Sequence, residues 1–173
     1  MHSTPAVMAL KKRRALLPIA VGGFTAGLLD LISAFIIYGW GVPRGIASGL
    51  LGTKALHGGT GTWVLGVFLH FFIAFSATTI YMLASRKLDF LRTNYIVCGL
   101  FYGIAIFLVM NLVVLPLSAV PFPVGPFPVR GLIRGILIHM LIIGLPISVS
   151  LRLLSQETQQ EWAEMRVSLT CPI

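Results

Sequence analysis

The sequence predicts an all-α polytopic membrane protein, a bundle of four transmembrane helices. Hydrophobic residues make up 57% of its 173 residues and charged residues only 10%, and the mean hydropathy is +0.93. A soluble chain of this length could not bury so much apolar surface. The apolar residues gather in four runs, each close to the ~20 residues that cross a ~30 Å hydrocarbon core. Each run is expected to be helical because lipid offers no partners for backbone N–H and C=O groups.

The runs divide the chain into one membrane domain and two polar ends. We predict spans at about 16–40, 62–84, 95–117 and 132–153. Together they form a single transmembrane domain over 16–153, flanked by a basic N-terminal segment over 1–15 and a polar tail over 154–173. A secretory signal peptide is the competing interpretation of the N-terminus, because basic residues precede its apolar run. That run is long for such a signal, and no convincing small-residue cleavage site follows it.

Basic residues predict the orientation. The ends of the spans that we assign to the cytoplasm carry nine of them: Lys11, Lys12, Arg13, Arg14, Arg86, Lys87, Arg92, Arg152 and Arg166. The opposite side carries four: Arg44, Lys54, Arg130 and Arg134. The positive-inside rule therefore places both termini in the cytoplasm. Because the basic residues lie at the ends of the spans, we attribute the net charge of +8 to membrane topology. We therefore expect no nucleic-acid partner.

The two outer loops differ in character. The loop at 41–61 places apolar residues among Gly and Ser after Pro43, which favours a short interfacial helix that could cover the bundle. The loop near 121–129 repeats Pro-Phe-Pro-Val, which favours a stiff, extended polyproline segment.

Each span holds an isolated polar residue, namely Asp30, His70, Asn111 or His139. All four follow stripes of small residues, which mark the faces where helices pack closely in lipid. Counting ~1.5 Å of rise per residue places them roughly 10–15 Å below the outer surface, so they can share one layer. A carboxylate near the midplane costs roughly 2.5–3.5 kcal/mol on insertion scales, and such residues are usually paired or functional.

This polar layer has several interpretations. It can simply hydrogen-bond neighbouring helices. It can form a proton or small-solute site, with Asp30 and a histidine exchanging a proton and with Arg44 and Arg134 attracting anions at the outer mouth. It can be a redox site in which His70 and His139 ligate a haem b. A metal site built from Asp30, His70 and His139 is a further, lower-ranked alternative.

The sequence favours a non-enzymatic accessory or assembly subunit of a membrane complex, with solute or proton translocation as the alternative. Phosphate-binding loops, G-x-S-x-G and H-E-x-x-H motifs are absent, and Asp30 is the only acidic residue within the predicted spans. The chain has almost no mass outside the membrane, which suits an accessory role within a larger complex or a homodimer. The sequence does not identify a cofactor. Cys98 and Cys171 show no metal or disulfide spacing and are expected to be free thiols.

Several short motifs carry a family resemblance. They are Ala-Gly-x-x-Asp ending at Asp30, Leu69-His70-Phe71, Met110-Asn111-Leu112 followed by Leu115-Pro116-Leu117-Ser118, and His139-Met140 followed by Gly144-Leu145-Pro146. In this order, over residues 22–153, the chain resembles a group of small, uncharacterised four-span proteins of the bacterial inner membrane. The resemblance implies the four-span topology and that location. It implies no activity.

Overall fold

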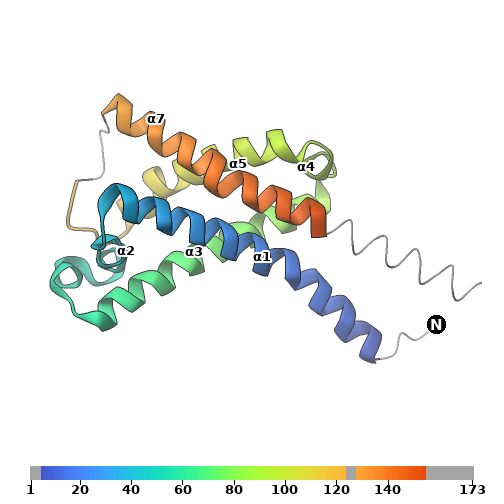
Figure 1. Cartoon of the computed structure of the whole chain (residues 1–173), viewed down its shortest axis with the longest axis horizontal. Helices are drawn as coiled ribbons and strands as arrows, with labels where there is room; N and C mark the ends of the chain where they lie inside the picture. Colours follow the sequence, from blue (N-terminus) through green and yellow to red (C-terminus); the bar gives the residue numbers. More distant parts are fainter. Residues whose placement is uncertain (1–4, 124–127, 155–173) are drawn as a thin grey trace, which may run out of the picture.

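The computed structural model describes residues 5–123 and 128–154, and it is helical throughout apart from short links (Figure 1). Its elements are α1 (Pro5–Tyr38), α2 (Val42–Leu51), the 3-10 helix η1 (Gly52–His57), α3 (Thr60–Lys87), α4 (Phe90–Thr93), α5 (Tyr95–Val109), the π-helical η2 (Met110–Val114), α6 (Leu115–Leu117), α7 (Val129–Ile138) and the π-helical η3 (His139–Gly144). A further α-helical stretch continues from η3 over residues 145–154.

Four helical segments are long and apolar enough to cross a membrane: Leu16–Tyr38, Thr60–Lys87, Tyr95–Leu117 and Val129–Leu154. We refer to them as the first to fourth spans. The predicted all-helical, four-span fold is thereby confirmed. The second and fourth spans are longer than predicted, because the helices continue beyond the apolar runs at both ends. Residues 1–4 and 155–173, which include most of the predicted tail, lie outside the described residues, as does the centre of the Pro-rich loop.

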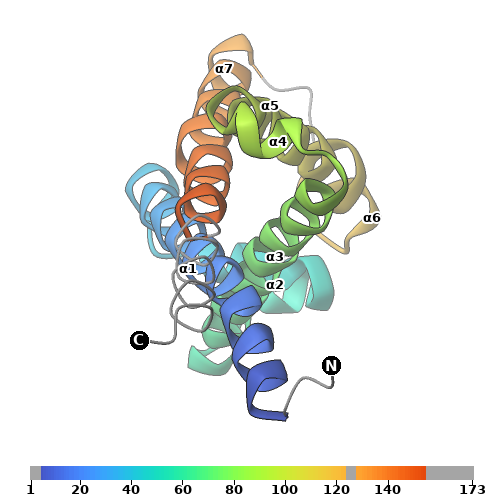
Figure 2. The same ribbon diagram turned by 90° about the vertical axis from the view of Figure 1, so that its right-hand side faces the viewer.

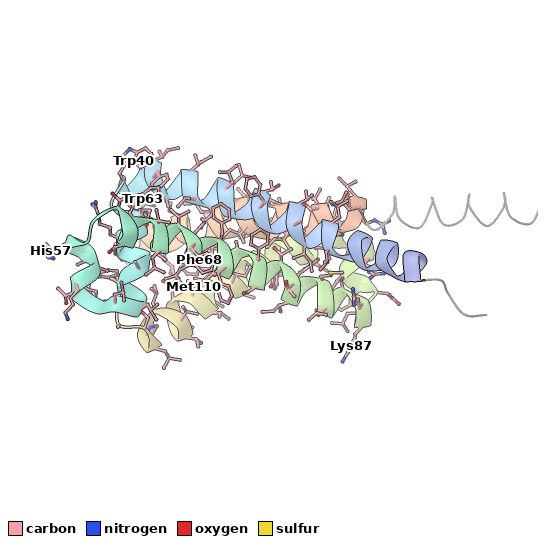
Figure 3. All side chains as sticks on the ribbon, turned by 90° about the horizontal axis from the view of Figure 1, so that it is seen from below. Trp40, His57, Trp63, Phe68, Lys87 and Met110 are labelled. Carbon is pink, nitrogen blue, oxygen red and sulfur yellow. The ribbon has the colours of Figure 1, made fainter. Side chains whose placement is uncertain are left out.

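The spans run alternately along one long axis (Figure 1). At one end of the bundle, the α2 end, α2 and η1 follow the first span; at the other, the α4 end, α4 joins the second span to the third. Trp40, His57 and Trp63 lie at the α2 end and Lys87 at the α4 end (Figure 3). At the α2 end the Phe35 and Trp40 rings are 4.6 Å apart, and the Trp63 indole N–H donates to the Trp40 carbonyl at 3.1 Å. Aromatic clusters of this kind are typical of a membrane–water interface.

The spans associate in two close pairs, the first with the second and the third with the fourth, and the fourth span also packs on the first. Figure 2 shows the same arrangement end-on. The second and third spans scarcely touch through their backbones. The Tyr102 hydroxyl bridges them by donating to the Ala77 carbonyl at 2.6 Å, and the Tyr102 and Tyr81 rings lie 4.9 Å apart. Side chains, and not close backbone contacts, therefore join the second span to the third.

Glycines allow both close pairs to form. In the first pair, a Cβ at Gly27 would lie 2.9 Å from the Phe71 ring. In the second pair, a Cβ at Gly144 would collide with the carbonyl oxygen of Gly99 and lie 2.7 Å from the Gly103 backbone nitrogen. Dispersion contacts between closely packed backbones are the main attraction between helices in lipid, so these positions hold the pairs together.

The main buried core lies on the α4 side of the bundle. It consists of Ala26, Tyr81, Met82, Ile143, Ile147 and Leu151. Ala26 and Ile147 are completely buried. Tight packing on this side contrasts with the α2 side, where the four predicted polar residues lie.

The helix predicted in the first outer loop is present as α2, and it packs on α3. A Cβ at Gly66 would collide with the carbonyl of Pro43, so the two helices meet backbone to backbone. Gly39 and Gly52 flank α2 with positive φ angles of 77° and 65°, which only glycine adopts readily. The start of the second outer loop is tied to α2 by the Ala119 amide, which donates to the Gly49 carbonyl at 2.9 Å.

We predict that Gly144→Ala lowers the free energy of unfolding by about 1–3 kcal/mol, because the added methyl group overpacks the contact between the third and fourth spans. The measurement is reversible unfolding in mixed micelles, followed by circular dichroism. Gly61→Ala is the matched control, since a Cβ there meets no atom within 4 Å. A Gly144→Ala protein as stable as the control would contradict this packing.

Candidate functional site

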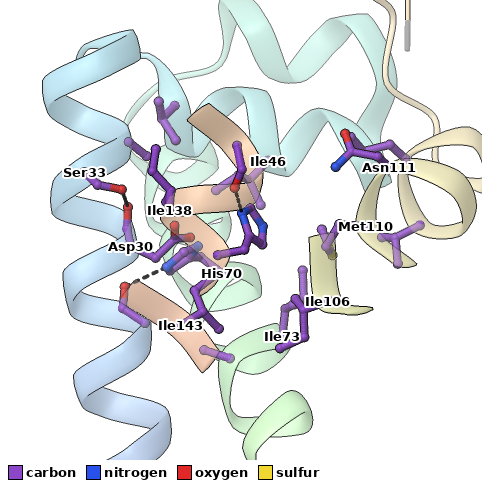
Figure 4. Close-up of a pocket in the computed structure, with 18 of the residues that line it drawn as sticks. Asp30, Ser33, Ile46, His70, Ile73, Ile106, Met110, Asn111, Ile138 and Ile143 are labelled. Carbon is purple, nitrogen blue, oxygen red and sulfur yellow. Dashed lines mark hydrogen bonds between the residues drawn. The ribbon is translucent and has the colours of Figure 1, made fainter. Parts of the chain in front are cut away.

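A cavity of about 380 Å³ lies on the α2 side of the core, between all four spans. Figure 4 shows it in close-up. Most of its wall is aliphatic, including Ile37, Ile73, Ile106 and Ile138. The polar side chains that line it are Asp30, Ser33, Tyr38, His70, Asn111, Ser118 and His139. No Lys or Arg is among the described residues that line it.

The cavity is bounded differently at its two ends. Toward the α4 end, Ala77, Ile106 and Ile143 form its floor, and Ile143 already belongs to the buried core. Toward the α2 end it is covered by Gly45 and Ile46 of α2 and by Ser118 and Val120 of the second outer loop. The hydrogen bond from Ala119 to Gly49 joins these two covering segments. The structure therefore shows a pocket and not a continuous path along the bundle.

Asp30 comes from the first span, one turn beyond the close contact at Gly27. Among the described residues its carboxylate makes no hydrogen bond or ion pair, although it interacts electrostatically with His139 and His70. Asp30 and His70 point toward one another in Figure 4. The Ser33 hydroxyl donates to the main-chain carbonyl of Asp30 at 2.8 Å and leaves the carboxylate free.

His70 connects the first two spans. Its Nε2 lies 2.8 Å from the Gly27 carbonyl oxygen. A carbonyl can only accept, so Nε2 must carry the proton of this bond, and in a neutral ring Nδ1 is left with a lone pair. Gly27 has no side chain, and this lets the ring reach the backbone of the neighbouring helix.

His139 forms its hydrogen bond through Nδ1, whereas His70 forms its bond through Nε2. Its Nδ1 lies 2.8 Å from the Gly135 carbonyl, within the same span. By the same reasoning, a neutral His139 ring has its lone pair on Nε2. The ring also packs edge-on against Phe107, with centroids 5.2 Å apart.

Asn111 lies on the far side of the cavity from Asp30 and His70 (Figure 4). Its Nδ2 donates one N–H to the Phe107 carbonyl at 2.8 Å, so its second N–H and its amide oxygen remain. Asn111 is thus part of the cavity wall but is separated from the Asp30–His70 group.

The two π-helical stretches contribute Asn111 and His139 to the cavity. Each ends two residues before a proline, at Pro116 or Pro146. Proline has no N–H and its ring crowds the carbonyl four residues earlier, here Leu112 or Ile142. A widened turn relieves that crowding, and single π-turns of this kind occur often at functional sites.

The structure therefore places all four predicted polar residues on one cavity, but it places neither predicted arginine there. Arg134 lies over the Tyr38 ring, 5.6 Å from its centroid, and donates to the Tyr38 hydroxyl at 3.5 Å. Arg44 lies on α2, and its buried Nε has no hydrogen-bond partner among the described residues. Neither side chain presents its charge to the cavity.

The metal and haem hypotheses gain no support from this geometry. Among residues 5–123 and 128–154, no three His, Cys, Asp or Glu side chains are grouped so that they could hold a metal ion, which corrects the Asp30, His70 and His139 alternative. For a haem, His70 would have to offer its Nε2 to the iron, but this atom is bonded to Gly27. In neutral rings, the nitrogen left with a lone pair is Nδ1 in His70 but Nε2 in His139.

Sequence reasoning expected a covering helix in the first outer loop but missed Tyr38 and the glycine face by which α2 lines the cavity. The signal for α2 is the recurrence of glycine at Gly41, Gly45 and Gly49, which puts a side-chain-free face on one side of a short helix. Gly45 and Gly49 both line the cavity.

Comparisons of the chain with protein-family models, with curated proteins and with solved structures find no match.

We predict that His70→Phe lowers the free energy of unfolding by about 0.6–1.7 kcal/mol, the range measured for hydrogen bonds between membrane helices. His139→Phe is the matched control because its bond lies within one span, and it should cost less. Unfolding in mixed micelles measures both. Equal losses would show that the His70–Gly27 bond does not hold the first two spans together.

Proposed function

We propose that this chain is a multi-pass membrane protein that binds a small, largely apolar molecule carrying a polar group. One observation carries the proposal: a cavity of about 380 Å³ has aliphatic walls and a few converging polar side chains. Its volume lies in the range of about 300–1,000 Å³ that is typical of small-molecule sites, and so does the combination of an apolar lining with few polar groups.

The proposed activity is binding, with transport only if the protein changes shape. The floor at Ala77, Ile106 and Ile143 closes the cavity toward the α4 end. A solute that crosses the membrane through this site would require the pairs of spans to move apart there.

The accessory-subunit hypothesis is not favoured by any specific feature of the described residues. The exposed side chains of the spans are apolar, as lipid contact alone requires. A cavity with converging polar groups is not needed for docking to a partner. We therefore rank small-solute binding above an accessory role.

Orientation and location are part of the proposal. In the described residues, Arg86, Lys87, Arg92 and Arg152 lie toward the α4 end. The positive-inside rule then puts that end in the cytoplasm and the cavity in the outer half of the bilayer. The resemblance to four-span bacterial proteins supports the inner membrane as the location.

The binding function is tested by photolabelling with adamantyl diazirine, a small apolar probe, on protein in phosphatidylcholine vesicles. We expect peptide mapping to find adducts on cavity residues such as Ile73, Ile106 and Met110. Lipid-facing Phe68 and Leu112, which are 65% and 70% exposed, report background labelling from the bilayer. Adducts on the lipid-facing residues alone would refute a binding cavity.

A pair of glycine variants controls that experiment. Gly45 lines the cavity, and a Cβ added there meets no atom within 4 Å, so Gly45→Leu should place its side chain in open space and reduce cavity labelling to background. Gly61 is equally unobstructed but does not line the cavity. Gly61→Leu should leave cavity labelling unchanged.

The orientation is tested by cysteine labelling in a Cys98→Ser, Cys171→Ser background. Thr53 in η1 and Thr93 in α4 are both exposed and lie at opposite ends of the bundle. We expect Thr53→Cys to react with a membrane-impermeant maleimide in intact cells and Thr93→Cys to react only after lysis. The reverse pattern would invert the topology.

A further inference from the structure

The hydrogen bonds around the cavity follow one rule. Four polar side chains from the spans each donate a hydrogen bond to a backbone carbonyl: Ser33 to Asp30, His70 to Gly27, Asn111 to Phe107, and His139 to Gly135. Ser118, at the end of the third span, donates to Leu115 at 2.7 Å. Asn111 keeps one further N–H, and the other donors of these five side chains are already engaged by the protein.

Apart from the second N–H of Asn111, their remaining polar groups are acceptors. With neutral rings, these are Nδ1 of His70, Nε2 of His139 and the amide oxygen of Asn111, and the Asp30 carboxylate adds two oxygens. Among the described residues, Arg44 Nε is the only fully buried side-chain nitrogen or oxygen that has no hydrogen-bond partner. None of the acceptors named above is therefore both fully buried and without a partner. They are therefore reachable from the cavity they line.

Donors are scarce at the same site. The described lining contains no Lys or Arg. Besides the second N–H of Asn111, Tyr38 is the exception among the lining side chains, because its hydroxyl accepts from Arg134 and keeps its own proton. It lies at the last residue of the first span, is 67% exposed and is well removed in sequence from Asp30.

From this inventory we propose that the cavity selects an amphipathic organic cation, an alkyl or alicyclic amine whose N–H groups meet Asp30, His70 and His139. The apolar part of the ligand fills the aliphatic wall, and its ammonium group supplies the charge that Asp30 lacks among the described residues. An anion of the same shape would meet lone pairs and a carboxylate, so the site would repel it. This reverses the expectation that arginines at the mouth attract anions. The inference rests on the proposed binding function.

The test is competition against adamantyl diazirine by three compounds that share one hydrocarbon cage: adamantylamine, adamantanol and adamantane carboxylate. It is done at about pH 8, where free imidazole is neutral and alkylamines are protonated. Labelling of Phe68 and Leu112 corrects for different partitioning of the competitors into lipid. We expect the amine to displace cavity labelling at about tenfold lower concentration than the alcohol, the ratio that one charge-assisted hydrogen bond provides. The carboxylate should not compete.

Asp30→Asn keeps the size of the side chain and removes its charge. In this variant the advantage of the amine over the alcohol should disappear, while the alcohol competes within about twofold of its original concentration. If Asp30→Asn does not fold, the order of the three competitors on the unaltered protein still decides the ligand class. His139→Phe, which removes one acceptor and no bond between spans, should then weaken competition by the amine selectively.

The outcomes separate this inference from the proposed function. Absence of cavity labelling refutes binding itself. Cavity labelling that the alcohol or the carboxylate displaces as well as the amine does leaves binding intact and overturns the selection of a cation.

Discussion

The absence of hydrogen-bond partners in lipid is the constraint on which the rest of the structure depends. Within the spans, every polar side chain with an assigned hydrogen bond donates to a backbone carbonyl, apart from the Arg134–Tyr38 pair; Thr78 and Ser85 in the core and His70 and Asn111 at the cavity are examples. Carbonyls are available because each oxygen has a second lone pair beyond its helical bond. Buried donors are satisfied in this way, and the acceptors of the same side chains are left over. A bundle that follows this rule has an acceptor-rich interior wherever its helices separate.

Helix separation is itself a consequence of where the glycines lie. Gly27 draws the second span onto the first, and Gly103 and Gly144 draw the third and fourth together. No comparable contact joins the second span to the third, which Tyr102 bridges with a long side chain. Two tight pairs held apart on one side leave a space that aliphatic side chains line but do not fill. The cavity therefore follows from the uneven distribution of small residues among the four interfaces.

Much of this arrangement could be predicted from the sequence, and the rest depends on tertiary contacts. Hydropathy fixed the third span to the residue, 95–117, and small-residue spacing identified the inward faces on which Asp30 and His70 lie. The π-helical turns were missed although Pro116 and Pro146 signal them. α2 packs on α3 in a contact that includes the close approach of Pro43 to Gly66, and periodicity contains no information about this tertiary contact. Charge counting likewise could not show that Arg134 stacks on Tyr38 instead of facing the cavity.

Asp30 links the stability of the fold to occupancy of the cavity. A carboxylate inside a span is costly unless it is protonated, hydrogen-bonded or paired. The neighbouring donors of Ser33 and His70 are both committed to carbonyls, so the described protein offers Asp30 no direct partner. A ligand that brings N–H groups and positive charge supplies that partner, and a ligand that binds only the folded state stabilises it by mass action. The same unpaired carboxylate that makes the empty bundle less stable thus gives the cavity its preference for a cation.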